Sequence, residues 1–298
     1  MRLSLHWRTL GSAVDLETLL GAASGAGFAG VEARRADLLA FARRHGGSGV
    51  ARLFAQQALC QVATPVGVDL GASEADFEAA CTGGQQLCRY LRGLTNYGVG
   101  QTLLTVAAPP TPPAGPGAER TVTRLRLLAD LAASAGFALL LDPEPPGEAA
   151  PVAEVAPAVS TRRAGVGGDA VPPPAAAPRP TPEGRAAELA YLCAWVAAAD
   201  RPNVGLVFDG WRWPGPRSLP PGLPLHCRIA DAPPEGTERL LPGRGGRDLA
   251  GALQGLRAIE YAGYVSVDAP VPGTTDPYEG ARRARVATER VVDAAFRF

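Results

Sequence analysis

Residues 248–270, DLAGALQGLRAIEYAGYVSVDAP, combine a complete helix pattern with a strand pattern. The helix pattern begins after Asp248, a residue type that caps helix N-termini, and it ends at Gly263. The apolar run YVSVDAP (264–270) follows at once and is typical of a buried strand. A helix that leads directly into a buried strand is the repeating unit of parallel α/β proteins.

The same alternation extends through the rest of the chain. Apolar runs typical of strands occupy residues 3–7, 27–34, 59–68, 99–108, 137–142, 204–209, 224–231 and 264–270. Helical patterns separate most of them, and the clearest lie at 119–136, 184–199 and 281–296. Because eight strand–helix units close a (β/α)8 TIM barrel, we predict an α/β protein with a single barrel domain over residues 1–298.

One segment departs from this pattern. Pro145–Pro182 is 38 residues long, contains 10 prolines and has almost no bulky apolar residues. Such a segment cannot bury enough apolar surface to offset the entropy lost on ordering, so we predict a flexible Pro/Ala-rich insertion after the fifth strand. The remaining 260 residues are close to the roughly 250 of a typical barrel.

Composition excludes several functions. The chain has 29 basic and 29 acidic residues and no formal net charge, which argues against a nucleic-acid-binding protein. All the basic residues are arginine, and without lysine neither Schiff-base chemistry, pyridoxal-phosphate attachment nor a Walker phosphate loop is available. We find no apolar run long enough to span a membrane and no signal-peptide pattern, so we expect a cytoplasmic protein.

Cysteine and histidine are too sparse for the usual metal sites. The five cysteines form no C-x-x-C pair, and we expect free, mostly buried thiols. The histidines are His6, His45 and His226, and His45 lies in ARRHGG, which resembles the end of a surface helix. We therefore predict no cofactor and no bound metal.

Chemistry-bearing residues recur where the predicted strands end. Side chains at the carboxyl ends of TIM-barrel strands converge on one pocket. The residues at these positions are His6, Glu32, Asp142 with Glu144, Asp209, His226 with Arg228, and Asp268. A group of carboxylates around a cation suits either metal binding or proton transfer next to a carbonyl.

Five stretches carry a resemblance to a known family. They are SGAGFAGVEAR (24–34), LLLDPEPP (139–146), PNVGLVFDGWRW (202–213), LHCRIADAP (225–233) and LLPGRGGRDLAGALQGLRAIEYAGYVSVDAP (240–270). They resemble the xylose isomerase-like TIM-barrel superfamily, which includes sugar-phosphate isomerases and epimerases, inosose dehydratases and AP endonucleases. The resemblance implies a small-molecule substrate and a homodimer. Three histidines are too few for the histidine-rich three-zinc site of the AP endonucleases.

The resemblance also implies a set of metal ligands, and this sequence departs from it. Family members hold a divalent ion through a Glu, an Asp, a His and a Glu after strands five to eight. The matching positions here are Asp142 (or Glu144), Asp209, Arg228 and Asp268. Arginine has no lone pair to donate and stays protonated, so Arg228 cannot ligate a cation. We predict that its guanidinium takes the metal position among the three aspartates, and that at least one acid keeps a raised pKa.

We predict that these five residues, Asp142, Glu144, Asp209, Arg228 and Asp268, form the catalytic group. The residues expected to bind substrate are His6, Trp7, Arg8, Glu32, Trp211, Arg212, His226 and Arg244. We expect His226 to lie away from Arg228 and to reach the site only through a bulge or a shift in strand register.

The leading hypothesis is a metal-independent acid/base enzyme that moves a proton next to a carbonyl, as an isomerase, epimerase, dehydratase or cyclase. Its substrate would be small and oxygenated, and either anionic or like a natural product of secondary metabolism. One alternative is a divalent-metal sugar or cyclitol isomerase/epimerase with altered ligands. A second is a non-catalytic protein that binds a ligand or a partner.

Overall fold

The computed structural model describes residues 1–110, 112–115, 117–143, 182–213, 219, 222–233 and 238–296. Eight parallel strands form a closed barrel in sequence order, because β8 pairs with β1. The strands are β1 (Arg2–His6), β2 (Gly30–Glu32), β3 (Cys60–Pro65), β4 (Gly100–Ala107), β5 (Ala138–Asp142), β6 (Val204–Asp209), β7 (Leu225–Ile229) and β8 (Tyr264–Val267). The predicted TIM-barrel class is confirmed.

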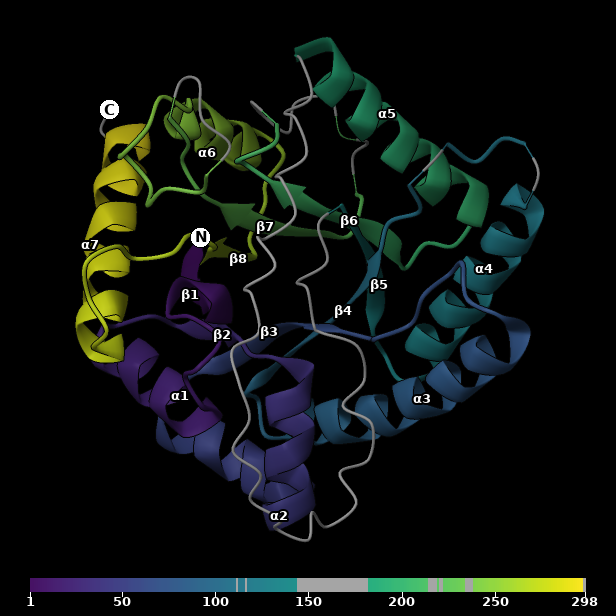
Figure 1. The fold of residues 1–298 in the computed structure, drawn as a ribbon, viewed down its shortest axis with the longest axis horizontal. Coiled ribbons are helices and arrows are strands. Elements are labelled where there is room, and N and C mark those ends of the chain that lie inside the picture. The colour runs from purple at the N-terminus through teal and green to yellow at the C-terminus, as the bar shows by residue number, and fades with distance from the viewer. Residues whose placement is uncertain are drawn as a thin grey trace, which may run out of the picture.

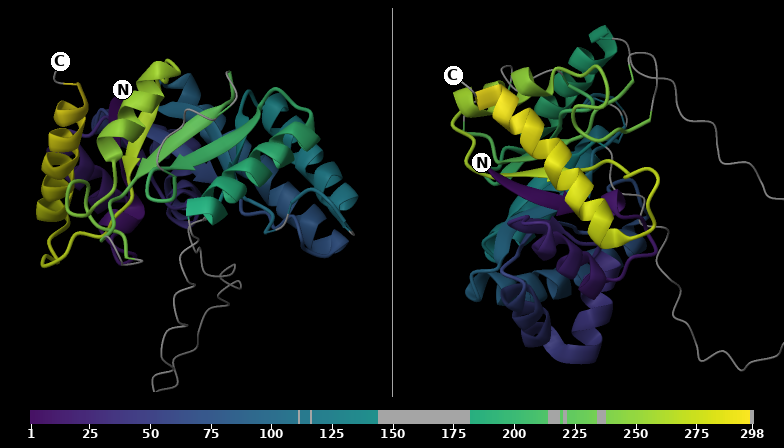
Figure 2. Two further views of the ribbon diagram at one scale, coloured as in Figure 1. Left: turned by 90° about the horizontal axis from the view of Figure 1, so that it is seen from above. Right: turned by 90° about the vertical axis from the view of Figure 1, so that its left-hand side faces the viewer.

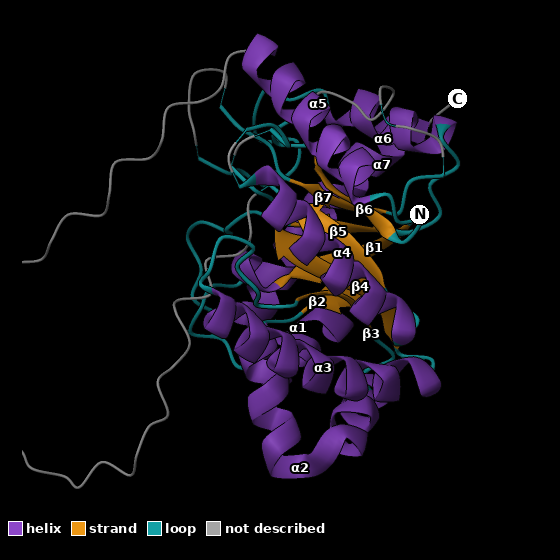
Figure 3. Ribbon diagram, turned by 90° about the vertical axis from the view of Figure 1, so that its right-hand side faces the viewer, coloured by secondary structure: helices purple, strands orange, loops and turns teal. Residues whose placement is uncertain are grey.

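Helices surround the barrel (Figures 1 and 3). They are α1 (Leu16–Gly25), α2 (Arg35–Gln56), α3 (Glu74–Asn96), α4 (Ala118–Ser134), α5 (Pro182–Ala199), α6 (Leu249–Ala258) and α7 (Pro277–Phe296), with a short 3-10 turn at Trp7–Thr9. The chain closes on itself where α7 packs against α1 and α6, which Figure 2 shows from two further sides. The residues described between β6 and β7 contain no helix.

Local sequence explains where the helices start and bend. Asp15, Ser73 and Asp248 cap α1, α3 and α6, and each side chain accepts a hydrogen bond from a backbone N–H in the first turn. The long helix α2 is bent at Gly46, whose φ of 73° is a left-handed conformation that glycine adopts without steric cost.

The strands bury large apolar side chains between the barrel and its helices. Leu5, Leu139, Leu141, Leu206 and Val265 have no exposed surface. Polar side chains are nevertheless buried near the strand ends, and they include most of the predicted site residues described below. None of the helices that the structure describes is long and apolar enough to cross a membrane. The predicted insertion at 145–182 lies outside the described residues, apart from Pro182, where α5 begins.

Candidate active site at the carboxyl ends of the strands

Arg228 lies inside the barrel and joins carboxylates from two other strands. Its Nη1 donates to Oδ2 of Asp142 at 2.7 Å, and its Nη2 and Nε donate to Oε2 of Glu32 at 2.8 and 3.1 Å. The three side chains are at most 3% exposed. Glu32 ends β2 and Asp142 ends β5, so contacts from β7 cross the barrel interior. We call the four buried carboxylates of Glu32, Asp142, Asp209 and Asp268 the carboxylate ring. The guanidinium stands within it; of the three aspartates predicted around it, Asp142 is a partner and Asp209 and Asp268 are not, and its second partner is Glu32.

His226 belongs to the same cluster, and the expectation that it lies away from Arg228 is wrong. Its Nε2 lies 2.8 Å from Oε1 of Glu32, and the side chain has no exposed surface. Side chains alternate between the two faces of a strand, so residues two apart share one face. Positions 226 and 228 of β7 thus both point into the barrel without any bulge, and Glu32 is the partner that they share.

Asp268 anchors a second cluster on the other side of the ring. Its Oδ1 and Oδ2 accept hydrogen bonds from Nε and Nη2 of Arg8 at 3.0 and 2.6 Å. Nδ1 of His6 lies 3.2 Å from Oδ1 of Asp268 and also 3.2 Å from the backbone N of Arg8. The first contact requires a proton on Nδ1 and the second requires a lone pair there, so only one of them is a hydrogen bond at a time. Nε2 of His6 makes no hydrogen bond within the described part of the chain.

Arg239 completes the ring, and the sequence reasoning missed it. Its Nη2 donates to Oδ2 of Asp209 at 2.6 Å, and its Nη1 lies 3.5 Å from Oδ2 of Asp268. The guanidinium also lies over the ring of Trp211, 4.9 Å from the centroid. Arg239 follows β7 in a loop and not at a strand end, so the strand-end rule could not select it. The available signal was a basic residue directly before the quoted LLPGRGG stretch.

A backbone cradle fixes the loop that carries Arg239. Asp231 and Leu240 exchange backbone hydrogen bonds of 2.7 and 2.9 Å in an antiparallel bridge. The buried carboxylate of Asp231 then accepts the backbone N–H groups of Ala232, Gly243, Gly245 and Arg247 at 2.8 to 3.0 Å. Gly245 is needed here, because a Cβ at this position would stand 2.2 Å from the carbonyl oxygen of Ala232. The loop therefore places Arg239 at the ring by fixed backbone contacts.

The arginines hold the buried acids in their charged form. Burial alone would raise the pKa of Glu32, but Arg228 and His226 outweigh it and hold that pKa well below its usual range. Burial also opposes the ionised form of Asp268, whose pKa is held well below its usual range by His6, Arg239 and Arg8. The raised acid pKa that the sequence predicted is therefore wrong for these two groups. Burial lowers the pKa of His6 below 6.5 although Asp268 opposes the shift.

The aromatic and basic residues predicted at the mouth divide into two sets. Trp211 is half-buried between the guanidiniums of Arg239 and Arg212, and Arg212 forms an ion pair of 2.8 Å with Glu188 of α5. Trp7 is half-buried beside the His6 ring, at a centroid distance of 5.5 Å. These residues lie next to the ring, and the substrate contacts expected of them stay a prediction.

Arg244 differs from this set. Its side chain is exposed and lines a cavity against α7 rather than the carboxylate ring. Glu144, predicted as catalytic, lies outside the described residues.

The positions that the resemblance assigns to metal ligands do not fit a divalent ion. Arg228 presents only N–H donors at one of them, and each of Asp142, Asp209 and Asp268 has an arginine nitrogen within 2.7 Å. Among the described residues, no three His, Cys, Asp or Glu side chains converge as a metal site requires. The three aspartates therefore have guanidinium groups as their cationic partners in place of a metal ion.

Comparison with known proteins places this arrangement on a known scaffold. The sequence matches no protein-family model, and no curated protein matches it. A xylose isomerase domain protein from Alicyclobacillus acidocaldarius superposes with a TM-score of 0.73 at 23% identity over 99% of both chains. An IolI protein with a bound zinc atom gives 0.71 at 18% identity over 100% of both chains.

The D-psicose 3-epimerase of Clostridium cellulolyticum, solved with D-tagatose, gives a TM-score of 0.65 at 14% identity over 98% of both chains. At these identities the similarity shows a shared fold and leaves the reaction open.

Proposed function

We propose that this chain, which has the xylose isomerase-like TIM-barrel fold that its sequence motifs predicted, is an isomerase or epimerase that works without a divalent metal. The proposed reaction is proton transfer at a carbon next to a carbonyl of a small oxygenated substrate. The observation that carries the proposal is the carboxylate ring, in which arginines stand where a metal ion would need ligands and Nε2 of His6 has no hydrogen-bond partner among the described residues.

His6 is the proposed general base. A base must be unprotonated at the working pH, and burial lowers the pKa of His6 below 6.5, so its imidazole is neutral near pH 7. When Nδ1 donates to Asp268 instead of accepting from the backbone N–H of Arg8, the neutral ring has its lone pair on Nε2, directed away from the carboxylate. A buried aspartate that contacts Nδ1 of a histidine and leaves Nε2 to take up the proton is a common arrangement for proton abstraction.

Arg8 is the proposed stabiliser of the enolate. It shares Asp268 with His6, and its side chain is still 22% exposed, so a substrate oxygen can reach its N–H groups. In the first step the C–H bond breaks, the proton moves to Nε2 of His6, and the electron pair forms the enolate. Return of the proton from His6 to the neighbouring carbon, with the α-hydroxyl proton passing to the enolate oxygen, gives an isomer. Delivery of a proton from water to the opposite face, while His6 releases its own proton to water, gives an epimer. A fixed guanidinium favours the negatively charged oxygen of the enolate over the neutral carbonyl.

Glu32, Asp142 and Arg228 have a different proposed role. Their contacts are mutual and almost fully buried, and the guanidinium uses three of its five N–H groups in them. Within this cluster Arg228 supplies one fixed positive charge between the two carboxylates. Because both carboxylates already contact Arg228, the cluster can keep its arrangement without binding a divalent metal ion.

A non-catalytic binding protein is the second candidate, and one observation favours it. Glu32, Asp142, Asp209 and Asp268 are each already paired with an arginine, as in a network whose role is structural. Within the described part of the chain, an unpaired histidine nitrogen also occurs in the Glu32 cluster, at Nδ1 of His226, so the two functions are distinguished by the loss of hydrogen exchange in His6→Gln.

Exchange of substrate hydrogen with solvent tests the enzyme directly. Purified protein treated with a chelator is incubated in D2O with D-psicose and D-tagatose, and loss of the proton next to the carbonyl is followed by NMR. The proposal expects exchange that is unchanged by the chelator and lost in His6→Gln. His45→Gln changes an exposed histidine on α2 and serves as the matched control. Exchange that requires added Zn2+, Mn2+ or Mg2+ contradicts metal independence, and undiminished exchange in His6→Gln contradicts the assigned base.

A further inference from the structure

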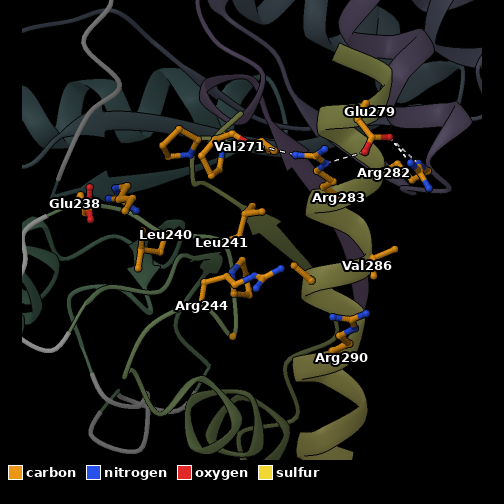
Figure 4. Close-up of a pocket in the computed structure, with 16 residues that line it drawn as sticks. Glu238, Leu240, Leu241, Arg244, Val271, Glu279, Arg282, Arg283, Val286 and Arg290 are labelled. Atoms are coloured by element: carbon orange, nitrogen blue, oxygen red, sulfur yellow. Dashed lines mark hydrogen bonds and ion pairs between the residues drawn. The ribbon is translucent and has the colours of Figure 1, made fainter. Parts of the chain in front are cut away.

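A cavity of about 720 Å³ lies beside the carboxylate ring, between α7 and the loops that follow β7 and β8 (Figure 4). Its volume is in the range of small-molecule binding sites. The loop after β7 supplies residues 238–244, the loop after β8 supplies residues 270–272, and the rest of the wall is one face of α7.

The wall is rich in unneutralised positive charge. It contains five arginines and two glutamates. Arg282 and Arg283 both form ion pairs with the same glutamate, Glu279. Arg244 and Arg290 are exposed, and their side chains form no ion pair or hydrogen bond within the described part of the chain. Figure 4 shows Arg244 extending toward α7, on which Arg290 lies.

The rest of the wall is apolar. Leu240 and Leu241 face Val286 across the cavity, and Val271 lies with two prolines at one end (Figure 4). Val286 is 41% exposed, which is unusual for a valine on a helix that otherwise packs against the barrel. An apolar wall with arginines converging from a loop and from a helix matches a molecule that has an apolar body and an acidic group.

Arg239 connects this cavity with the candidate active site. It lines the cavity, and its Nη2 donates to Asp209 in the carboxylate ring. The bridge between Asp231 and Leu240 fixes this arginine between the two regions. A ligand that fills the cavity therefore ends next to the ring.

We propose that this cavity binds the acidic, partly apolar end of the substrate, whose carboxylate, sulfonate or phosphate pairs with Arg244 and Arg290. The inference deepens the proposed function and rests on it for the identity of the ligand as the substrate. The ring itself contains four carboxylates and only three guanidiniums among the described residues, so it favours a neutral reacting end over an anionic one. The substrate class is thus a carbonyl compound with a remote acidic group and an apolar portion between them.

Two fluorescent probes test the cavity without any turnover. 8-Anilino-1-naphthalenesulfonate has an apolar ring system and a sulfonate, and N-phenyl-1-naphthylamine has the same rings without the charge. We expect the intact protein to bind one equivalent of the sulfonate at least tenfold more tightly than the neutral probe. Arg244→Ala and Arg290→Ala should each weaken sulfonate binding by roughly tenfold, with the neutral probe unaffected, because each removes one charge-assisted contact.

The controls separate this inference from the proposed function. Arg52→Ala removes an exposed arginine on α2, which does not line the cavity, and should leave both probes unchanged. Equal affinity for the two probes, or equal losses in Arg52→Ala and Arg290→Ala, overturns the cavity assignment. His6→Gln should bind the sulfonate like the wild type while losing hydrogen exchange. Selective probe binding supports the cavity whether or not the neutral sugars exchange their hydrogen, because those sugars lack the acidic group. Exchange without selective probe binding refutes the cavity and leaves the proposed enzyme standing.

Discussion

Replacing Arg228 by methionine should reveal how much the folded state depends on the buried cation. Methionine retains most of the volume but removes the partner of Glu32 and Asp142, which are 2% and 1% exposed. Breaking a buried ion pair from one side costs about 3–5 kcal/mol, because the remaining charge is left in the interior. For a domain of this size each kcal/mol lowers Tm by roughly 2–4 °C, so we expect a fall on the order of 10 °C at pH 8.

The pH dependence provides the sharper test. In the wild type the pKa of Glu32 is held well below 4.5, so its ionised form adds stability above pH 4.5 that is lost as the pH falls through the folded-state pKa. Without Arg228, burial is no longer outweighed and the folded-state pKa rises above 4.5. The sign then reverses, and protonation of Glu32 stabilises the folded variant. The Tm difference between Arg228→Met and the wild type should therefore shrink between pH 8 and pH 5.

Thermal unfolding followed by circular dichroism measures both effects. Adding Glu32→Gln to Arg228→Met removes one stranded charge and should recover about half of the lost stability. A fall in Tm of less than 2 °C at pH 8, or a difference that does not change with pH, would refute the view that this cluster is held together by charge.

Three further changes test the ring and its loop. Arg228→His restores a lone pair beside the carboxylates of Glu32 and Asp142 and should bind Zn2+ detectably by mass spectrometry of the purified protein, whereas Arg228→Gln should not; equal zinc in both would contradict the account of why this ring rejects metal. If His6 is the base, kcat/KM should fall as the pH decreases through a pKa that burial has lowered from the ordinary histidine value of 6.5; a decline centred above pH 6.5 assigns the base elsewhere. Asp231→Asn places an NH2 against backbone N–H donors and should cost about 3 kcal/mol in urea unfolding, with weaker sulfonate binding in the cavity. The matched change Asp248→Asn keeps a good helix cap and should cost almost nothing, so similar losses in both would remove the special role of the cradle.

The strand-end rule selected most of the ring, because the carboxyl ends of parallel strands must meet in a closed barrel. It identified Asp142, Asp209 and Asp268 and the cation that stands among the acids. The rule could not determine which carboxylate each arginine contacts. The sequence placed Arg228 among Asp142, Asp209 and Asp268; in the structure it pairs with Asp142, as predicted, and its other partner is Glu32, which was expected to bind substrate.

Sequence alone determined the barrel, its strand order and the exclusion of lysine chemistry, because hydrophobic periodicity and residue identity are local properties. Only the tertiary structure decided which arginine neutralises which carboxylate, since that depends on distances across the interior between residues up to 260 positions apart. The same holds for Arg239 and for the cavity against α7. Both depend on a loop whose path is set by the backbone contacts of Asp231, and no periodic pattern encodes such a path.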